Sequence, residues 1–270
     1  MSAQAPAFTQ APWSSGQVSP HAYCVLAPNP GPMTLDGTNT WVVMAPDGDE
    51  AIVVDPGPLD EAHLAEVLRV VTERGARVTE TILTHGHLDH SEAGPRFGEL
   101  TGSRVRAVGR GHDDLGDGDL VTAAGVDLRV VATPGHTSDS ISFALEADRA
   151  LLTGDMILGR GTTVVAHPDG ELAAYLASLE RIRALTGGGE VTAILPGHGP
   201  VIPDAAAMVE FYRLHRAERL DQVRAALADG AGQEDDPVEG VLRRVYSSVP
   251  EAVWPAARLS IRAQLDYLRS

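Results

Sequence analysis

The stretch Thr84-His85-Gly86-His87-Leu88-Asp89-His90 decides the fold of this chain. It begins where a predicted β-strand, residues 78–84, ends. A tight loop that contains glycine at a strand end lets three imidazoles and one carboxylate converge on a small volume. Neutral imidazole and carboxylate are the ligands that zinc prefers beside thiolate. The spacing therefore predicts a metal site at the end of this strand.

Three later loops repeat the pattern of a polar side chain that follows an apolar strand. Glycine precedes each of these side chains, and its small size permits a close approach of the backbone. One loop of this kind would usually be an ordinary turn, but four in order along the chain indicate one shared site. The three later side chains are His136, Asp155 and His198, after strands predicted at residues 127–132, 150–153 and 191–195.

This ordered set of side chains resembles the metallo-β-lactamase superfamily. Asp55, in Val-Val-Asp-Pro-Gly, matches the first motif of that superfamily. The resemblance covers about residues 20–203 and implies an α+β fold, the αββα sandwich of two mixed β-sheets flanked by helices. It also implies a hydrolase that holds two zinc ions at one edge of the sheets. The same ligand types accept iron or manganese.

The resemblance assigns a role to each of these positions, and all seven ligand positions of the dinuclear members are filled. The ligands expected for one metal are His85, His87 and His136. Those expected for the second are Asp89, His90 and His198. Asp155 is expected to bridge the two metals, and Asp55 to support the ligands from behind. A hydroxide shared by the metals is the expected nucleophile, and Asp89 and Asp155 are the predicted catalytic carboxylates.

A narrower resemblance, to the beta-lactamase-like protein 2 family, spans almost the whole chain. It rests on residues 29–40, 159–164 and 196–202, and on the segment that carries His215, Arg216 and Arg219. It implies a di-zinc hydrolase with a small C-terminal helical, winged-helix-like domain. The eukaryotic member of that family is a single-stranded-RNA endonuclease, so single-stranded RNA is the first substrate expected.

Other hydrolase activities remain as alternatives. The same architecture resembles thioesterases that release acyl chains from carrier proteins, which would make the substrate an acyl or small-molecule thioester. Hydrolysis of β-lactams or lactones is less expected, because the chain has no lysine to bind a substrate carboxylate. The alternative outside enzymes is a metal-binding scaffold without turnover.

Composition and charge limit the partners. The 270 residues are 43% hydrophobic and 21% charged, which is typical of a soluble globular protein. No apolar run approaches the ~20 residues of a membrane-spanning helix, and the first residues lack the pattern of a secretory signal. We therefore expect a cytoplasmic protein with no membrane partner. The formal net charge of −16 repels polyanions, so duplex DNA is not an expected partner.

The pattern along the chain predicts three parts: a flexible lead-in at residues 1–20, a catalytic domain at 21–203 and a helical domain at 204–270. Asp204 can cap a long helix that runs to about Ala228. The other helices are expected at residues 59–74, 171–185, 237–247 and 251–269. Besides the strands named above, strands are expected at residues 22–26, 40–45, 51–55, 104–108 and 140–145.

Five further side chains are candidates for substrate binding. They are Thr38, Asn39, Thr162, His167 and His215. The alternative for Thr38, Asn39 and Thr162 is that they hold their glycine-rich loops by hydrogen bonds.

The arginines near His215 recur close to helical spacing: Arg213, Arg216, Arg219 and Arg224. They either face a substrate or form a solvated helix face that pairs with Glu218 and Asp221. His63 lies in an acidic segment and is expected to be solvated.

Overall fold

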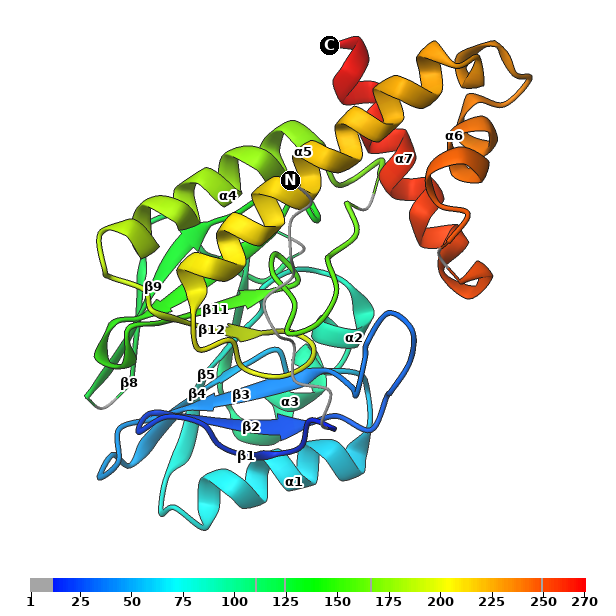
Figure 1. The fold of residues 1–270 in the computed structure, drawn as a ribbon. Helices are drawn as coiled ribbons and strands as arrows, with labels where there is room; N and C mark the ends of the chain where they lie inside the picture. The colour runs from blue at the N-terminus through cyan, green and yellow to red at the C-terminus, as the bar shows by residue number, and fades with distance from the viewer. Residues whose placement is uncertain (1–11, 110, 124, 166, 249) are drawn as a thin grey trace.

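The computed structural model describes residues 12–109, 111–123, 125–165, 167–248 and 250–270. Over this part, two β-sheets pack face to face and helices cover both outer faces (Figure 1). This arrangement confirms the predicted α+β sandwich. None of the helices in the described ranges is both long enough and apolar enough to span a membrane.

The first sheet has seven strands in chain order. They are β1 (Gly16–Gln17), β2 (Ala22–Leu26), β3 (Asn39–Val43), β4 (Glu50–Val54), β5 (Arg77–Ile82), β6 (Arg104–Ala107) and β7 (Asp113–Asp114). Strands β1 to β4 pair antiparallel, and β4 to β7 pair parallel, so the sheet is mixed. The parallel pairs align the carboxyl ends of β4 and β5 at one edge, where the metal-ligand motif begins.

The second sheet has five strands in the order β12-β11-β10-β9-β8. They are β8 (Leu120–Ala123), β9 (Val126–Ala132), β10 (Ile141–Leu145), β11 (Ala150–Gly154) and β12 (Ala193–Pro196). Only β11 and β12 run parallel. Their carboxyl ends therefore lie side by side, and the loops that carry Asp155 and His198 leave from the same edge.

The core between the sheets contains alternate side chains of the facing strands, as the period of two in a β-strand requires. Trp41, Ile52 and Ile82 come from the first sheet, and Leu128 and Phe143 from the second. These side chains are almost fully buried. The strands they come from are thereby held rigid, which fixes the positions of the loops at their ends.

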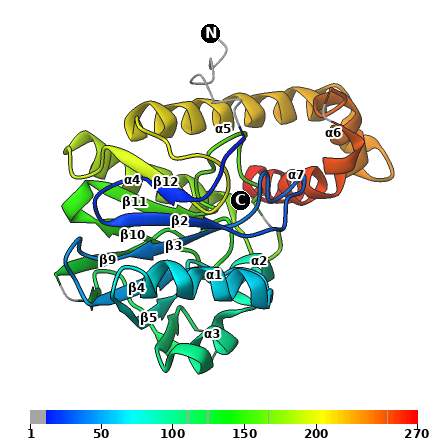
Figure 2. The same ribbon diagram turned by 90° about the horizontal axis from the view of Figure 1, so that it is seen from below.

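Helices cover the outer faces of the sandwich. Helix α1 (Glu61–Thr72) and helix α3 (Gly94–Thr101) pack on the first sheet, whereas α4 (Leu172–Gly187) and α5 (Ala205–Ala228) pack on the second (Figure 2). The Asp60 side chain caps α1 by accepting a hydrogen bond from the His63 amide, and Asp204 caps α5 in the same way. The one-turn helix α2 (Leu88–Ser91) lies inside the metal-ligand motif.

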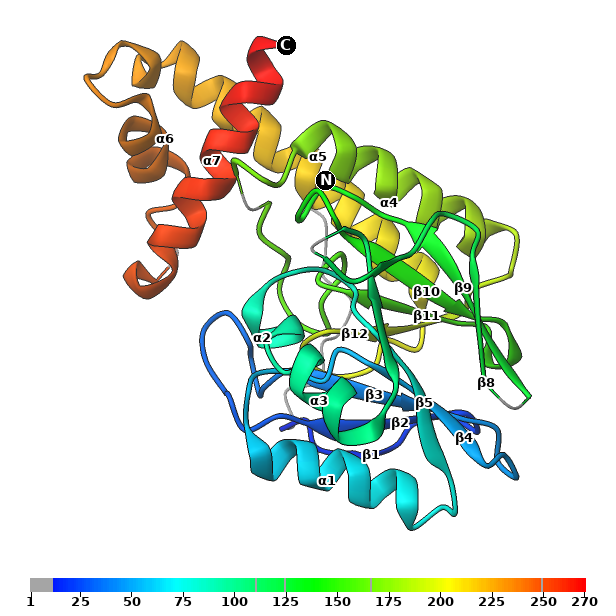
Figure 3. The same ribbon diagram turned by 180° about the vertical axis from the view of Figure 1, so that it is seen from behind.

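The C-terminal helices form a second, smaller core at one end of α5 (Figure 3). Helices α6 (Pro237–Val245) and α7 (Trp254–Arg269) pack there against the last turns of α5, and single turns of 3-10 helix lie at Ala231–Gln233 and Glu251–Val253. The earlier half of α5 packs instead on α4 and the second sheet. The described residues after 204 contain helices and no strand, so they include no β-hairpin wing.

Several predicted elements differ from the structure. Of the predicted lead-in, residues 1–11 lie outside the described residues, but residues 12–20 are not a loose segment. They include β1, which pairs with β2, and the Trp13 indole, which donates a hydrogen bond of 2.8 Å to Asn39 Oδ1. Four short elements were not predicted: β7, β8, α3 and the single 3-10 turn Glu146–Asp148. The two strands and the 3-10 turn have four residues or fewer and α3 contains glycine, so each leaves little periodic signal.

Candidate metal centre

The candidate ligands lie on loops at the carboxyl ends of strands from both sheets. The loop after β5 carries His85, His87, Asp89 and His90, whereas His136, Asp155 and His198 follow β9, β11 and β12. The structure therefore brings together, at one edge of the sandwich, all seven side chains that the sequence predicted as ligands. They form two groups, and within each group the ligand atoms lie within 4.8 Å of one another.

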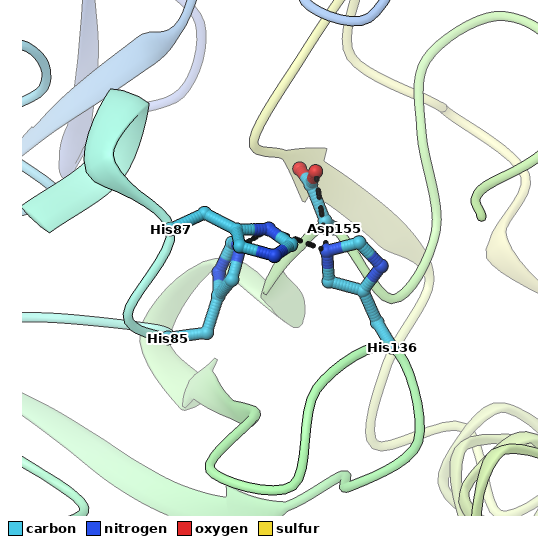
Figure 4. A group of neighbouring side chains, drawn as sticks. All are labelled: His85, His87, His136 and Asp155. Atoms are coloured by element: carbon cyan, nitrogen blue, oxygen red, sulfur yellow. Dashed lines mark hydrogen bonds and ion pairs between the residues drawn. The ribbon is translucent and has the colours of Figure 1, made fainter. Parts of the chain in front are cut away.

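The first group contains His85, His87, His136 and Asp155, whose rings and carboxylate turn toward one another (Figure 4). His87 Nδ1 lies 3.1 Å from His85 Nε2 and 3.0 Å from His136 Nε2. Three imidazole nitrogens that converge in this way cannot all be satisfied by hydrogen bonds to one another. A cation among them would use their lone pairs together.

The second group contains Asp89, His90 and His198. The two Nε2 atoms lie 3.2 Å apart, and Asp89 Oδ2 lies 3.2 Å from His198 Nε2. Both histidines are buried, but the Asp89 side chain keeps 30% of its surface exposed. Solvent therefore reaches the centre on the side of Asp89.

Asp155 lies between the two groups. Its Oδ1 atom is 3.4 Å from the Nε2 atoms of both His90 and His198, and its Oδ2 atom is 3.7 Å from His136 Nε2. Oδ1 is buried and has no hydrogen-bond partner within the described part of the chain. A buried carboxylate oxygen without a donor is costly unless a cation fills that role. Asp155 thus fits a position between two metal ions.

The far nitrogen of three ligand rings meets a carbonyl or a carboxylate. His136 Nδ1 donates to the Val164 carbonyl at 2.6 Å, His198 Nδ1 to the Gly37 carbonyl at 3.2 Å, and His90 Nδ1 to Asp55 Oδ2 at 2.8 Å. With the proton on Nδ1, each Nε2 presents its lone pair toward the centre. Contacts of this kind orient metal ligands and select their tautomer.

Asp55 supports both groups from behind. Its Oδ1 accepts a hydrogen bond of 2.7 Å from the Thr84 amide, and its Oδ2 accepts one of 2.7 Å from the Thr84 hydroxyl as well as the one from His90. The Thr84 hydroxyl can in turn accept from His85 Nδ1, 3.0 Å away. Asp55 has a φ of 52°, a left-handed conformation that is uncommon outside glycine. The supporting role of Thr84 was not predicted from the sequence, although Thr84 directly precedes the first ligand.

We expect Asp55→Asn to weaken metal binding by about 10- to 100-fold, the usual effect of losing such a contact to a ligand. Asparagine has an NH2 group in place of one carboxylate oxygen, and this group cannot accept the hydrogen bonds of Thr84 and His90. The His90 ring is then no longer held. Titration of the purified variant with zinc in competition with a chromophoric chelator measures this. Asp60→Asn, which keeps a capping oxygen on α1, is the control; equal zinc affinities for all three proteins would contradict the prediction.

The field at the centre favours positive charge. Burial alone would lower the pKa of His90, but the carboxylates of Asp155 and Asp55 raise it well above the ordinary value. Burial likewise opposes charge on His198, yet Asp155 and Asp89 raise its pKa to about 9. Burial would raise the pKa of Asp155, and the neighbouring His198 and His90 hold it far below the ordinary value instead. A divalent cation supplies the same positive charge as these protons.

Gly197 leaves the space that this arrangement needs. A Cβ atom on Gly197 would lie 2.7 Å from both Asp155 Oδ1 and His90 Cε1, far inside van der Waals contact. The backbone of the β12 loop can therefore approach the centre only with glycine at this position.

Comparisons with known proteins agree with this geometry. The family model of the metallo-beta-lactamase superfamily matches residues 33–107 and 95–198. The chain belongs to the metallo-β-lactamase superfamily. It is a hydrolase of that superfamily, and each of the two side-chain groups could hold a metal ion.

Two curated relatives and one solved structure are similar to this chain over most of its length. An atrochrysone carboxyl ACP thioesterase of Aspergillus chevalieri is 34% identical over 88% of this chain and 77% of the relative. A beta-lactamase-like protein 2 homologue of Caenorhabditis elegans is 33% identical over 90% and 82%. The structure of a beta-lactamase domain protein from Burkholderia ambifaria has a TM-score of 0.77 at 22% identity, over 94% of this chain and 88% of that chain, which supports the fold.

A cavity of about 370 Å³ lies beside the metal-ligand groups of this superfamily member. His136 and Asp155 line it at the centre, and its walls come from the loop before β3, residues 158–164, α5 and the C-terminal helices. Two of the candidate substrate residues, Thr162 and His215, line the cavity, with Thr162 Oγ1 3.4 Å from His215 Nε2.

The other candidate substrate residues lie elsewhere. Thr38 and Asn39 are fully buried and do not line the cavity. The Asn39 amide donates to the Pro196 and Gly199 carbonyls at 2.9 and 2.8 Å, so it holds the loop that carries His198, which is the alternative role considered for it. His167, the fifth candidate for substrate binding, does not line this cavity. Its Nε2 atom lies 2.9 Å from Asp266 Oδ2 of α7, because its loop turns toward the C-terminal helix.

His63 is buried rather than solvated. Its Nε2 lies 2.9 Å from the Thr40 hydroxyl, which donates to the Asp55 carbonyl at 2.7 Å. Burial lowers the pKa of His63 to about 4, so the ring is neutral. The acidic neighbours suggested a solvated face, but His63 shares the inward face of α1 with Val67 and Val70. That helical spacing was the signal that could have located it.

Proposed function

We propose that this chain is a metal-dependent acyl hydrolase that cleaves thioesters. The observation that carries the proposal is the cavity beside His136 and Asp155, because most of its wall is apolar. The apolar lining residues include Met33, Leu35, Leu158, Val164, Val253 and Ala257. A cavity of this volume and character suits an acyl chain, since ligand sites are concave, mostly apolar and carry few polar groups.

The residues at the centre fit the hydrolysis of such a bond. The two groups would hold two zinc ions, and iron or manganese are accepted by the same ligands. When bound, such cations supply Lewis acidity and lower the pKa of water. The Asp89 carboxylate lies at the open side and is ionised, because the His198 and His90 imidazoles outweigh the effect of burial and lower its pKa. It is therefore placed to accept a hydrogen bond from an attacking water and to orient it.

Support for a thioester comes also from a relative whose printed name is that of an ACP thioesterase. Single-stranded RNA, the substrate first expected, needs a path for several phosphates. The cavity has three arginines in its wall, and one of them, Arg160, is neutralised by an ion pair with Asp36. The apolar lining thus favours the acyl substrate.

We expect the zinc-loaded protein to hydrolyse hexanoyl-pantetheine, and chelation to abolish the activity until zinc or manganese is restored. Release of the free thiol, measured with a chromogenic disulfide, reports the reaction. An end-labelled single-stranded RNA is incubated with the same preparation. If the fully metal-loaded protein cleaves the RNA and leaves hexanoyl-pantetheine intact, the proposal is overturned. If it cleaves neither substrate, the result supports the scaffold alternative and also overturns the proposal.

A further inference from the structure

One wall of the cavity holds a buried cation, Arg216 of α5. Arg216 keeps only 4% of its surface exposed, yet it lines the cavity together with His136 and Asp155. One N–H of its guanidinium donates to the Thr163 carbonyl at 2.6 Å, and the group stacks on the Tyr175 ring at 4.6 Å. Its Nε atom is buried and finds no hydrogen-bond partner within the described ranges.

The other arginines of α5 show how unusual Arg216 is. Arg213 pairs with Glu180 and Glu210, and Arg224 pairs with Asp221, all on the solvent side. The solvated-face interpretation therefore holds for Arg224, which has its expected partner Asp221, whereas the partners of Arg213 differ from the expected ones. Neither Arg216 nor Arg219 forms an ion pair with a carboxylate in the part of the chain that the structure describes.

Arg219 lies one turn further along and also lines the cavity. Its guanidinium stacks on the Tyr246 ring at 4.7 Å and donates to the Val245 carbonyl at 3.2 Å. His215 lies on the same wall, and burial together with the charges of Arg216 and Arg219 lowers its pKa to about 4. At neutral pH the wall therefore carries two guanidinium charges beside a neutral imidazole.

A buried cation without a counter-ion is destabilising, and proteins rarely keep one unless a ligand completes it. The guanidinium plane matches the two oxygens of a carboxylate or phosphate. The Tyr175 and Tyr246 rings hold the two guanidinium groups in fixed orientations, so little side-chain freedom is lost when an anion binds.

We propose that Arg216 and Arg219 form an anion subsite in the acyl cavity, so that this hydrolase prefers thioesters that carry a second, negatively charged group. The group is an oxyanion, either a carboxylate at the far end of the acyl chain or the phosphate of a phosphopantetheine arm. The thioester part rests on the function proposed above, whereas the anion subsite itself does not.

Four substrates separate the two sources of the anion: hexanoyl- and adipoyl-pantetheine, each with and without the 4′-phosphate. We expect the anionic group that binds to raise kcat/KM by about 10- to 100-fold, as charge-assisted hydrogen bonds do. Arg216→Gln and Arg219→Gln should remove this preference, so that each variant hydrolyses the anionic and the neutral substrates with equal kcat/KM. Arg213→Gln, on the same helix but paired outside the cavity, should behave as the wild type.

Binding to the zinc-loaded protein keeps the test independent of turnover. Hexanoate and adipate share one carboxylate, and only adipate has a second for the arginines. In calorimetry, the wild type should bind adipate at least about tenfold more tightly than hexanoate, or phosphopantetheine at least about tenfold more tightly than pantetheine. Arg216→Gln should bind the two members of each pair equally. If Arg216→Gln does not fold, as circular dichroism reports, Arg219→Gln decides alone.

Equal binding of both members of each pair by the wild type would overturn the subsite. Wild-type protein that hydrolyses no thioester but binds adipate through Arg216 would overturn the proposed function and leave the subsite standing. An equal loss on neutral and anionic substrates in both variants would assign the arginines a purely structural role and also overturn the subsite.

Discussion

Asp155→Asn is expected to lower kcat/KM by more than about a thousandfold while the fold is retained. The amide has the shape of the carboxylate, so packing at this buried position is unchanged. It lacks the charge that lies 3.4 Å from the Nε2 atoms of His90 and His198. The single oxygen of asparagine cannot serve both groups, so the purified variant should also contain less metal. Thioester hydrolysis and elemental analysis of the same preparation measure both effects.

Asp221→Asn is the matched control for Asp155→Asn. Asp221 is an exposed carboxylate of α5 that pairs with Arg224 and belongs to neither ligand group. Its variant should keep the metal content and the rate of the wild type. The assignment of Asp155 would fail if its own variant kept both as well.

The second large effect is expected for Gly197→Ala. The added methyl group would lie 2.7 Å from Asp155 Oδ1 and from His90 Cε1, and 3.0 Å from the Gly154 carbonyl carbon. One member of each metal-ligand group must then move. Displacing reacting groups by about 1 Å commonly costs about a hundredfold in rate, and overpacking costs about 1–3 kcal/mol of stability. Hydrolysis rates and urea unfolding of the variant measure the two consequences.

Gly187→Ala provides the comparison. Gly187 is the exposed last residue of α4, and a Cβ atom there would meet no atom within 4 Å. Because alanine is a better helix former, this variant should unfold at the same or slightly higher urea concentration and hydrolyse at the wild-type rate. Equal rates for the two glycine variants would show that the space beside Asp155 is not required.

The ligand set could be predicted from the sequence because each of its members follows a strand. Runs of Val, Ile or Leu ahead of His85, His136, Asp155 and His198 mark strand ends. The positions of those ends, in a layered fold, bring distant loops to one edge. Long helices with a cap, such as the one after Asp204, were likewise visible in the pattern.

The pocket was harder to predict because its wall is assembled by tertiary packing. The charges of Arg213 and Arg216 look alike in the sequence, yet Arg213 is half-buried and paired with carboxylates, whereas Arg216 is buried against Tyr175. They are three positions apart, which places them about 60° from each other around the helix axis. Which face turns inward depends on how α5 packs on α4, and sequence periodicity does not show that for an amphipathic pattern as weak as this one.

Helix α5 has one half packed on the second sheet and the other half in the C-terminal core. The candidate metal ligands lie at strand ends, whereas His215, Arg216 and Arg219 all lie on helix α5. Chemistry and recognition can consequently change independently during evolution. Substitutions of the α5 side chains that line the cavity would change which molecules are accepted and leave the strand ends in place. Directed evolution of new specificities should start with this helix.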